Sequence, residues 1–189
     1  MKISLIALAL AAALPLSAQA SDALKYNFIE ADYASTHAFS TTLDGWKVKG
    51  SAAFGDDFYG AASYSQVSKN GGDLDEGTVG IGYRHAISDK TNWDSELSYV
   101  HDKVSGGGSS FSDNGYRIQT GLRGMLGAKF EGNINVNYTD VNDFGNGIGA
   151  GIGGMYHIND TWGITGGYEF SKRDNTDLNT WTLGVRASF

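Results

Sequence analysis

The chain of 189 residues has no cysteine and a single proline, Pro15. Without cysteine, the protein has no disulfide framework and no thiolate that could act as a nucleophile or a metal ligand. Proline interrupts the hydrogen-bond ladder of a sheet, so a stretch without proline from residue 16 onward suits long paired strands. The same absence argues against a disordered linker, because disordered segments are usually rich in proline.

A long apolar run is also missing from the chain after residue 20. Nothing there approaches the ~20 apolar residues of a membrane-spanning helix, so a membrane could be crossed only by strands. The shorter apolar run from Leu5 to Leu16 follows the positive Lys2 and precedes Ala18-Gln19-Ala20. This order predicts a signal peptide over residues 1–20, cleaved after Ala20, and a mature domain over residues 21–189.

Positively charged residues are fewer than negatively charged ones. Loss of Lys2 with the signal peptide moves the formal net charge from −7 to −8. Such a charge excludes a general binder of nucleic acid or other polyanions. Glycine, in contrast, is abundant at 27 residues, about twice the usual ~7%.

From Leu24 onward the chain divides into amphipathic segments of about ten residues, the length of a tilted membrane strand. The segments are 24–34, 45–55, 58–67, 77–87, 92–103, 115–126, 130–140, 147–158, 162–171 and 179–189. Ten segments predict an all-β, antiparallel, up-and-down transmembrane β-barrel, with eight strands as the alternative. The connections after odd-numbered segments are expected to be long and polar, and the others to be turns of two to four residues.

The final segment shows the alternation clearly. Trp181, Leu183, Val185 and Phe189 fall on one face, whereas Arg186 falls on the other. An aromatic terminal strand of this kind predicts recognition by the barrel-assembly machinery, and pairing with the first segment would close the barrel. The same periodicity would fit a soluble sandwich or a lipocalin-like barrel with its apolar face inward.

Aromatic residues at the segment ends favour the membrane barrel, because they form girdles at both interfaces of such proteins. The girdle near the termini is predicted to contain Phe54, Phe58, Trp93, Phe130, Trp162 and Phe189, and the opposite girdle Tyr33, Tyr64, Tyr99, Tyr116, Tyr138, Phe170 and Trp181. Charged residues fall on the other face of the strands, which would line the lumen.

A lumen of this size is narrow, and charges buried in it must be paired. We therefore predict a structural charge network that plugs the lumen, formed by Lys47, Lys49, Arg84, Glu96, Arg117, Arg123, Glu131, Glu169 and Arg186. Glu30, Asp32 and Asp94 are expected to share the same interior.

Four segments also carry a family resemblance: Tyr26–Tyr33, Gly50–Gly60, Asp160–Phe170 and Trp181–Phe189. With these segments, the chain resembles the activator-of-immunity family of outer-membrane and vesicle-associated barrel proteins from xanthomonad bacteria. The resemblance covers the mature chain as a pattern. It implies the barrel fold, an outer-membrane location and surface exposure, and it further implies release in vesicles and contact with host or neighbouring cells.

Possible catalytic patterns are weak. His101-Asp102 lies near the rim, but its omptin-like partner pair, Asp56-Asp57, falls at the opposite end. Gly149 to Gly154 matches G-x-G-x-x-G without the following helix that a dinucleotide site requires. The acidic run at Asp73–Glu76 lacks EF-hand spacing, and Lys172-Arg173 is a weak candidate for lipopolysaccharide phosphates.

We therefore expect no enzyme activity, catalytic residue, metal or cofactor. The predicted function is that of a monomeric outer-membrane barrel in a Gram-negative bacterium, a structural or interaction protein that acts through its extracellular loops. Its expected partners are outer-membrane lipid and lipopolysaccharide. A narrow channel is the first alternative, and a membrane-embedded hydrolase is the second.

Overall fold

The computed structural model describes residues 24–38, 40–173 and 176–189. The predicted signal peptide and its cleavage site after Ala20 lie outside the described residues. The strands are β1 (Phe28–Ala38), β2 (Thr41–Phe54), β3 (Phe58–Lys69), β4 (Gly72–Ser88), β5 (Thr91–Gly106), β6 (Ser109–Met125), β7 (Phe130–Val141), β8 (Gly145–His157), β9 (Trp162–Arg173) and β10 (Thr176–Ser188), with a short 3₁₀ turn, η1 (Asn142–Phe144), before β8. Among the described residues, no helix is long and apolar enough to cross a membrane.

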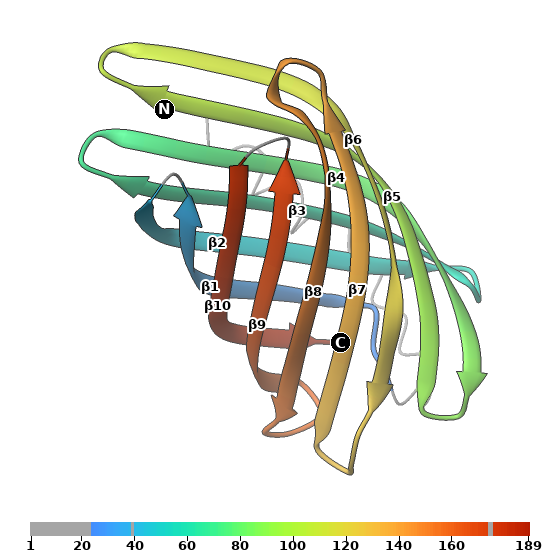
Figure 1. Ribbon diagram of the computed structural model, residues 1–189. Coiled ribbons are helices and arrows are strands. Elements are labelled where there is room, and N and C mark those ends of the chain that lie inside the picture. The colour runs from blue at the N-terminus through green and yellow to red at the C-terminus, as the bar shows by residue number, and fades with distance from the viewer. Residues whose placement is uncertain (1–23, 39, 174–175) are drawn as a thin grey trace.

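The ten strands form one closed antiparallel barrel, in which every strand pairs with its neighbours in sequence and β10 pairs with β1 (Figure 1). This confirms the predicted fold with ten strands. At the closing seam, Tyr33 lies opposite Leu183 and Glu30 lies opposite Arg186. Each of the ten strands thus has a partner on both sides, and the exposed edges of an open sheet are avoided.

We name the two ends of the barrel from the chain. The terminal end is where β1 begins and β10 ends, and the distal end carries the β1–β2, β3–β4, β5–β6, β7–β8 and β9–β10 connections. The predicted asymmetry of the connections is wrong, because at both ends four residues or fewer join one strand to the next. Residues expected in distal loops continue the strands instead. Their polar side chains keep the two-residue alternation, and the ladder extends with them.

The distal hairpins are therefore tight and tall. Asn70 and Gly71 both have positive φ, at 52° and 80°, as do Gly107 and Gly108 at 61° and 83°. Positive φ at both central residues is the geometry of a type I′ turn, which suits the twist of a two-residue hairpin. The β3–β4 and β5–β6 hairpins extend beyond their neighbours at the upper left of Figure 1.

The first segment was predicted four residues too early, at 24–34 instead of Phe28–Ala38. The strand begins at Phe28 rather than at Leu24. Leu24 and Tyr26 are 3% and 4% exposed, and they pack with Tyr59 in the one apolar cluster found among the described residues. The chain before β1 thus turns into the terminal mouth of the barrel.

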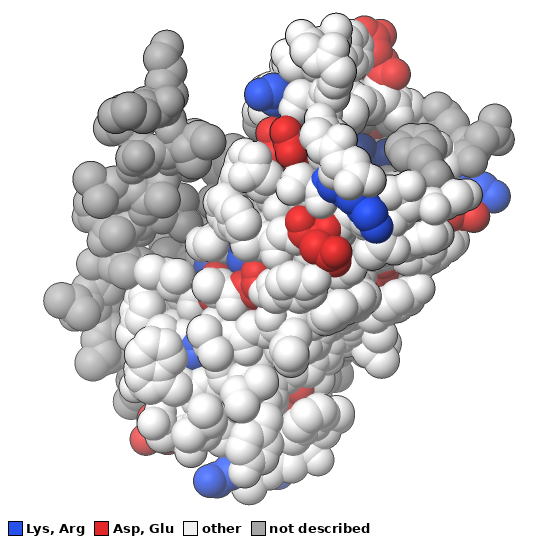
Figure 2. Space-filling view, turned by 90° about the vertical axis from the view of Figure 1, so that its left-hand side faces the viewer, with Lys and Arg blue, Asp and Glu red and all other residues white. Residues whose placement is uncertain are grey.

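Polarity is inverted relative to a soluble protein. Nine apolar residues are buried among the described part of the chain, against fifteen polar or charged ones, whereas large apolar side chains cover the outside. In Figure 2 charged atoms gather in the upper part of the view, above a broad surface formed mainly by uncharged residues. This excludes the soluble sandwich and the lipocalin-like barrel, in which the apolar face would form the core.

Glycines in the wall accommodate larger neighbours on the inner face. Gly149, Gly151 and Gly153 lie opposite Asn137, Asn135 and Asn133 on β7, and an added Cβ at each glycine would press on the amide of its partner. These positions therefore leave room for inward side chains. They do not belong to a nucleotide loop, because β8 continues as a strand through His157.

Candidate functional site: a charged lumen closed at both ends

Five charged side chains cross the lumen at the terminal end, and we call them the terminal cluster: Glu30, Lys49, Arg123, Glu131 and Arg186. Lys49 Nζ lies 2.5 Å from Glu30 Oε1, and Arg186 Nη2 lies 2.6 Å from Glu30 Oε2. Glu131 Oε1 accepts from two arginines: Arg186 Nη1 lies 3.4 Å away, and Arg123 Nε donates to it at 2.7 Å. The chain of ion pairs joins β2, β1 and β10 to β7 and β6 on the other side of the barrel.

The segment before β1, Leu24–Asn27, lies against this cluster. The Tyr26 hydroxyl donates to Asp94 Oδ1 at 2.6 Å and accepts from Asn92 Nδ2 at 3.0 Å. The guanidinium carbons of Arg84 and Arg123 each lie 4.6 Å from the centre of the Tyr26 ring, within range of a cation–π interaction. Burial raises the pKa of the Tyr26 phenol, so the phenol keeps its proton and remains a donor.

Tyr59 packs beside Tyr26, with 5.2 Å between the ring centroids. Its ring lies flat over Gly82 on the neighbouring strand, where a Cβ atom would overlap it. Tyr26 and Tyr59 therefore pack together beside the terminal cluster at this end of the lumen.

A second group, the distal cluster, crosses the lumen at the other end and consists of Glu76, Asp102, Arg117 and Arg173. Arg117 binds Glu76 with both terminal nitrogens, at 3.1 and 2.7 Å. Arg173 donates to Glu76 Oε2 at 3.3 Å and also pairs with Asp102. The bidentate geometry fixes the two planar groups relative to each other.

Between the clusters lies a polar chamber with a volume of about 280 Å³. Its lining includes Tyr26 and Arg123 at the terminal side, and Arg117 at the distal side. Two smaller cavities of about 120 and 100 Å³ adjoin it, since Lys47 and Glu169 line all three. The lumen is thus a hydrophilic space interrupted by side chains at both ends.

The structure distributes the predicted lumen residues over these three levels. Lys49, Arg123, Glu131 and Arg186 are in the terminal cluster, and Arg117 is in the distal cluster. Lys47, Glu96 and Glu169 line the chamber, where Glu96 accepts from Ser98 at 2.6 Å and Glu169 accepts from Asn137 at 3.3 Å. Arg84 stacks on Tyr26 and donates to the carbonyl oxygen of Asp56 at 3.0 Å.

Sequence reasoning missed the distal cluster as a group, as well as the role of Tyr26. Glu76 and Arg173 were assigned to loops, and Arg173 lies in the lumen rather than at a lipopolysaccharide-facing rim. The available signal was the alternation itself, because Glu76 lies two residues before inward-facing Thr78 and Arg173 lies two residues after Ser171, which also lines the lumen.

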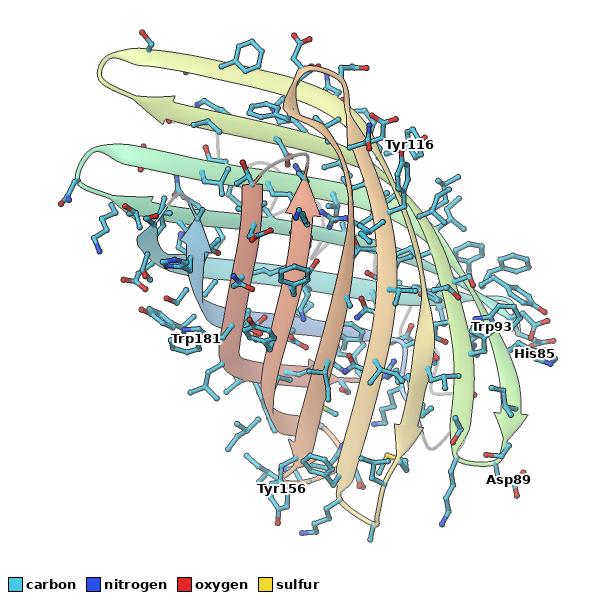
Figure 3. All side chains as sticks on the ribbon, in the orientation of Figure 1. His85, Asp89, Trp93, Tyr116, Tyr156 and Trp181 are labelled. Atoms are coloured by element: carbon cyan, nitrogen blue, oxygen red, sulfur yellow. The ribbon has the colours of Figure 1, made fainter. Side chains whose placement is uncertain are left out.

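On the outside, aromatic rings contact one another around each end. The ring centroids of Tyr33 and Trp181 lie 5.3 Å apart at the distal girdle, and those of Phe58 and Tyr83 lie 5.4 Å apart at the terminal girdle. Trp93, Tyr116, Tyr156 and Trp181 project away from the barrel (Figure 3). Trp181, Leu183 and Val185 on β10, and Phe189 directly after it, are all between 39% and 57% exposed.

The residues considered as candidates for catalysis do not lie close together. His101 faces outward and contacts Asn114, whereas the adjacent Asp102 faces the lumen. Asp56 and Asp57 lie at the terminal turn, at the other end of the barrel. In residues 24–38, 40–173 and 176–189, no group of three or more His, Asp or Glu side chains is arranged to hold a metal ion.

No family model matches the chain, and no curated protein matches it. The resemblance to the activator-of-immunity proteins therefore stays a prediction.

Solved structures do match. The NanC porin is 11% identical over 84% of this chain and 100% of its own, with a TM-score of 0.53. Ail, the attachment invasion locus protein of Yersinia pestis, is 18% identical over 88% of this chain and 100% of its own, with a TM-score of 0.43. Neisserial surface protein A is 17% identical over 86% of this chain and 96% of its own, with a TM-score of 0.42. Only the first score exceeds 0.5, and at 11% identity it bears on the fold alone.

Proposed function

We propose that the protein is a monomeric, non-catalytic β-barrel of the outer membrane of a Gram-negative bacterium, and that it presents its distal hairpins at the cell surface. One observation carries the membrane assignment: uncharged, largely apolar side chains cover the outside between two aromatic girdles, while the charges pair inside. Charged residues on the lipid face of such barrels are unfavourable, and lumen charges are not.

The orientation follows from the general build of these barrels, in which both termini face the periplasm and the taller hairpins face outward. The terminal end then lies in the periplasm and the distal end outside. Lipid and lipopolysaccharide would surround the outer face of the barrel, and the barrel-assembly machinery would recognise β10. Vesicle release and contact with a host or neighbouring cell stay predictions from the family resemblance.

The surface role is supported by the height of two hairpins. The strands β4, β5 and β6 have 17, 16 and 17 residues, against 11 to 14 in the other seven. Residues 84–88 of β4 extend past β3 at the terminal end, whereas the extra length of β6 lies at the distal end. The pairing of β6 with β7 stops at Gly115, so residues 109–114 of β6 rise past β7. These extensions carry exposed Val104 and Phe111 beyond the distal girdle, where a partner could contact them.

The absence of cysteine from the chain allows a direct test of location and orientation. Ser110→Cys places one thiol in the exposed β5–β6 hairpin, and Asp89→Cys places one in the exposed β4–β5 turn at the terminal end (Figure 3). A thiol reagent that cannot cross membranes should label the first variant in intact cells and the second only after lysis. The reverse result would overturn the orientation, and soluble periplasmic protein in fractionation would overturn the membrane assignment.

A narrow channel is the second candidate, favoured by the polar chamber of about 280 Å³. The two clusters together with Tyr26 argue for a closed resting state, because ion pairs narrow the lumen at both ends and the Tyr26 ring packs on the terminal cluster. Conductance of the purified protein in planar bilayers separates the two functions. A stable open step in the unmodified protein would favour the channel.

A further inference from the structure

The polar chamber is closed by different kinds of structure at its two ends. At the distal end all four cluster residues are on strands of the wall. At the terminal end an important part of the closure, Tyr26, is on a segment outside the barrel ladder, since β1 begins only at Phe28. Tyr26 lines the chamber directly.

The segment is held by the packing of Leu24 and Tyr26 and by hydrogen bonds outside the strand ladder. Besides the bonds of the Tyr26 hydroxyl, Lys25 Nζ donates to the carbonyl oxygen of Asp160 at 2.7 Å. Asn27 accepts a backbone hydrogen bond from Phe189 at 3.0 Å, and its side chain accepts from the Ala53 amide at 2.7 Å. The carbonyl oxygen of Lys25 accepts from Arg123 at 2.9 Å. Each contact joins the segment to the wall without being part of the interstrand ladder, so the segment can leave while the barrel stays closed.

The inward side chains of the segment would leave a gap on departure. Leu24 and Tyr26 supply two of the three buried side chains of the terminal apolar cluster, and only Tyr59 of that cluster belongs to a strand. Arg84 and Arg123 would lose the ring on which both lie. Their guanidinium groups would then face water entering from the terminal side.

The carboxylates of the distal cluster are on average less buried than those of the terminal cluster. The side chains of Glu76 and Asp102 are 21% and 4% exposed, and those of Glu30 and Glu131 are each 2% exposed. Lys49 of the terminal cluster is 34% exposed. The cavity of about 100 Å³ among the distal residues adjoins the chamber through Lys47 and Glu169. The terminal carboxylates, which lie beside the Tyr26 segment, are therefore the more deeply buried of the two groups.

We propose that residues Leu24–Asn27 are a displaceable latch, and that with the latch out the lumen passes small inorganic ions. The inference rests on the membrane barrel of the proposed function. It adds a gated activity and names the segment that controls it. Because the lumen carries cations and carboxylates at every level, such a path selects weakly between anions and cations.

Tyr26→Ala tests the latch, and Tyr26→Phe is the matched control that keeps the ring but removes the hydroxyl. Each is combined with Ser98→Cys, a near-isosteric change at a buried chamber position in a chain with no other thiol. A small charged thiosulfonate reagent should modify this introduced thiol at least about tenfold faster in the Tyr26→Ala barrel than in the Tyr26→Phe barrel or in the barrel that keeps Tyr26.

Planar-bilayer recording supplies the second measurement. The Tyr26→Ala protein should show a conductance step, and the Tyr26→Phe protein should remain closed. Equal modification rates in all three barrels would overturn the latch. Faster modification without any conductance step would overturn the ion path.

Folding is followed separately through heat-modifiable gel mobility, which should be the same in the three barrels. A variant that enters the membrane and shows the folded mobility is a valid test of the latch. Failure of the unmodified protein itself to enter membranes would instead count against the proposed function.

Discussion

The terminal and distal clusters use the same chemistry in different surroundings. Both link arginines to carboxylates across the lumen, yet the terminal cluster is covered by the Tyr26 and Phe28 rings, and Arg186 lies 4.1 Å from the Phe28 ring centre. The distal cluster has no such aromatic cover among the described residues, and its central carboxylate, Glu76, is 21% exposed against 2% for Glu30 and Glu131. An ion pair that is shielded from water is costly to break, because the remaining charge has no solvent to receive it. The terminal end should therefore determine stability more than the distal end.

The largest effect is expected from Glu131→Ala. The change leaves Arg123 and Arg186 without a shared carboxylate at a site that is almost completely buried. Breaking a buried pair from one side destabilises by about 3–5 kcal/mol. The midpoint of urea unfolding in liposomes should fall accordingly.

Glu96→Gln is the matched control, since Glu96 faces the same lumen and its side chain bonds only to Ser98 among the described hydrogen bonds. It should cost less than about 1 kcal/mol, as for one ordinary hydrogen bond. Equal losses of unfolding free energy in the two variants would show that the terminal cluster contributes no more to stability than the single hydrogen bond of Glu96.

A smaller effect is expected from Gly82→Ala, which tests the aromatic part of the terminal end. The new methyl group would overlap the Tyr59 ring, which must move away from β4. Overpacking of this kind costs about 1–3 kcal/mol. Gly60→Ala is the control on the outer face, where the added Cβ meets one ring atom of Phe54 at 3.9 Å. Both are measured by the same urea unfolding.

Next comes Glu76→Gln at the distal end. Arg117 and Arg173 lose their shared carboxylate, but water reaches this level of the lumen and can solvate the freed groups. We expect a loss of about 1–2 kcal/mol in urea unfolding, the value of a partly screened charged hydrogen bond. A loss as large as that of Glu131→Ala would remove the proposed difference between the two ends.

The smallest effect is local and depends on pH. Asp113, beyond the distal girdle, accepts from the amides of Asp143 and Asn114, and these bonds lower the pKa of its carboxyl. Because the pKa of Asp113 is lowered in the folded state, the stabilisation from these hydrogen bonds is complete above about pH 4. It is lost as the pH falls through the lower pKa of the folded state.

Hydrogen exchange of the Asp143 amide should therefore show its full protection at neutral pH and lose it in acid, once the known pH dependence of chemical exchange is removed. In Asp113→Asn the amide should be poorly protected at every pH. Protection that is independent of both pH and this substitution would contradict the assignment.

The alternation of apolar and polar residues made the barrel predictable. A slip of one residue in β6, for example, would have turned Arg117 and Arg123 toward the outside, so register followed directly from the sequence. The lengths of the hairpins were not predictable in this way, because polar stretches such as residues 68–76 resemble loops in composition. Asn70-Gly71 was the available signal of a two-residue turn.

The contacts of the candidate site were less accessible to prediction than its residue types. That Lys49 and Arg186 face inward follows from periodicity, but that both bind Glu30 depends on how the barrel closes. The insertion of Tyr26 depends on space left by Gly82 and on two arginines from distant strands. No local pattern encodes such a meeting of segments about 60 to 100 residues apart.

The spacing of the two girdles has a further consequence for the choice of bilayer. Trp181 on β10 and Phe189, which directly follows β10, are eight residues apart, which is about 26 Å along a chain that rises ~3.3 Å per residue. With the usual tilt of 35–45°, the hydrophobic thickness is about 20 Å. The protein therefore matches thin membranes, and in thicker bilayers it would have to deform the surrounding lipid.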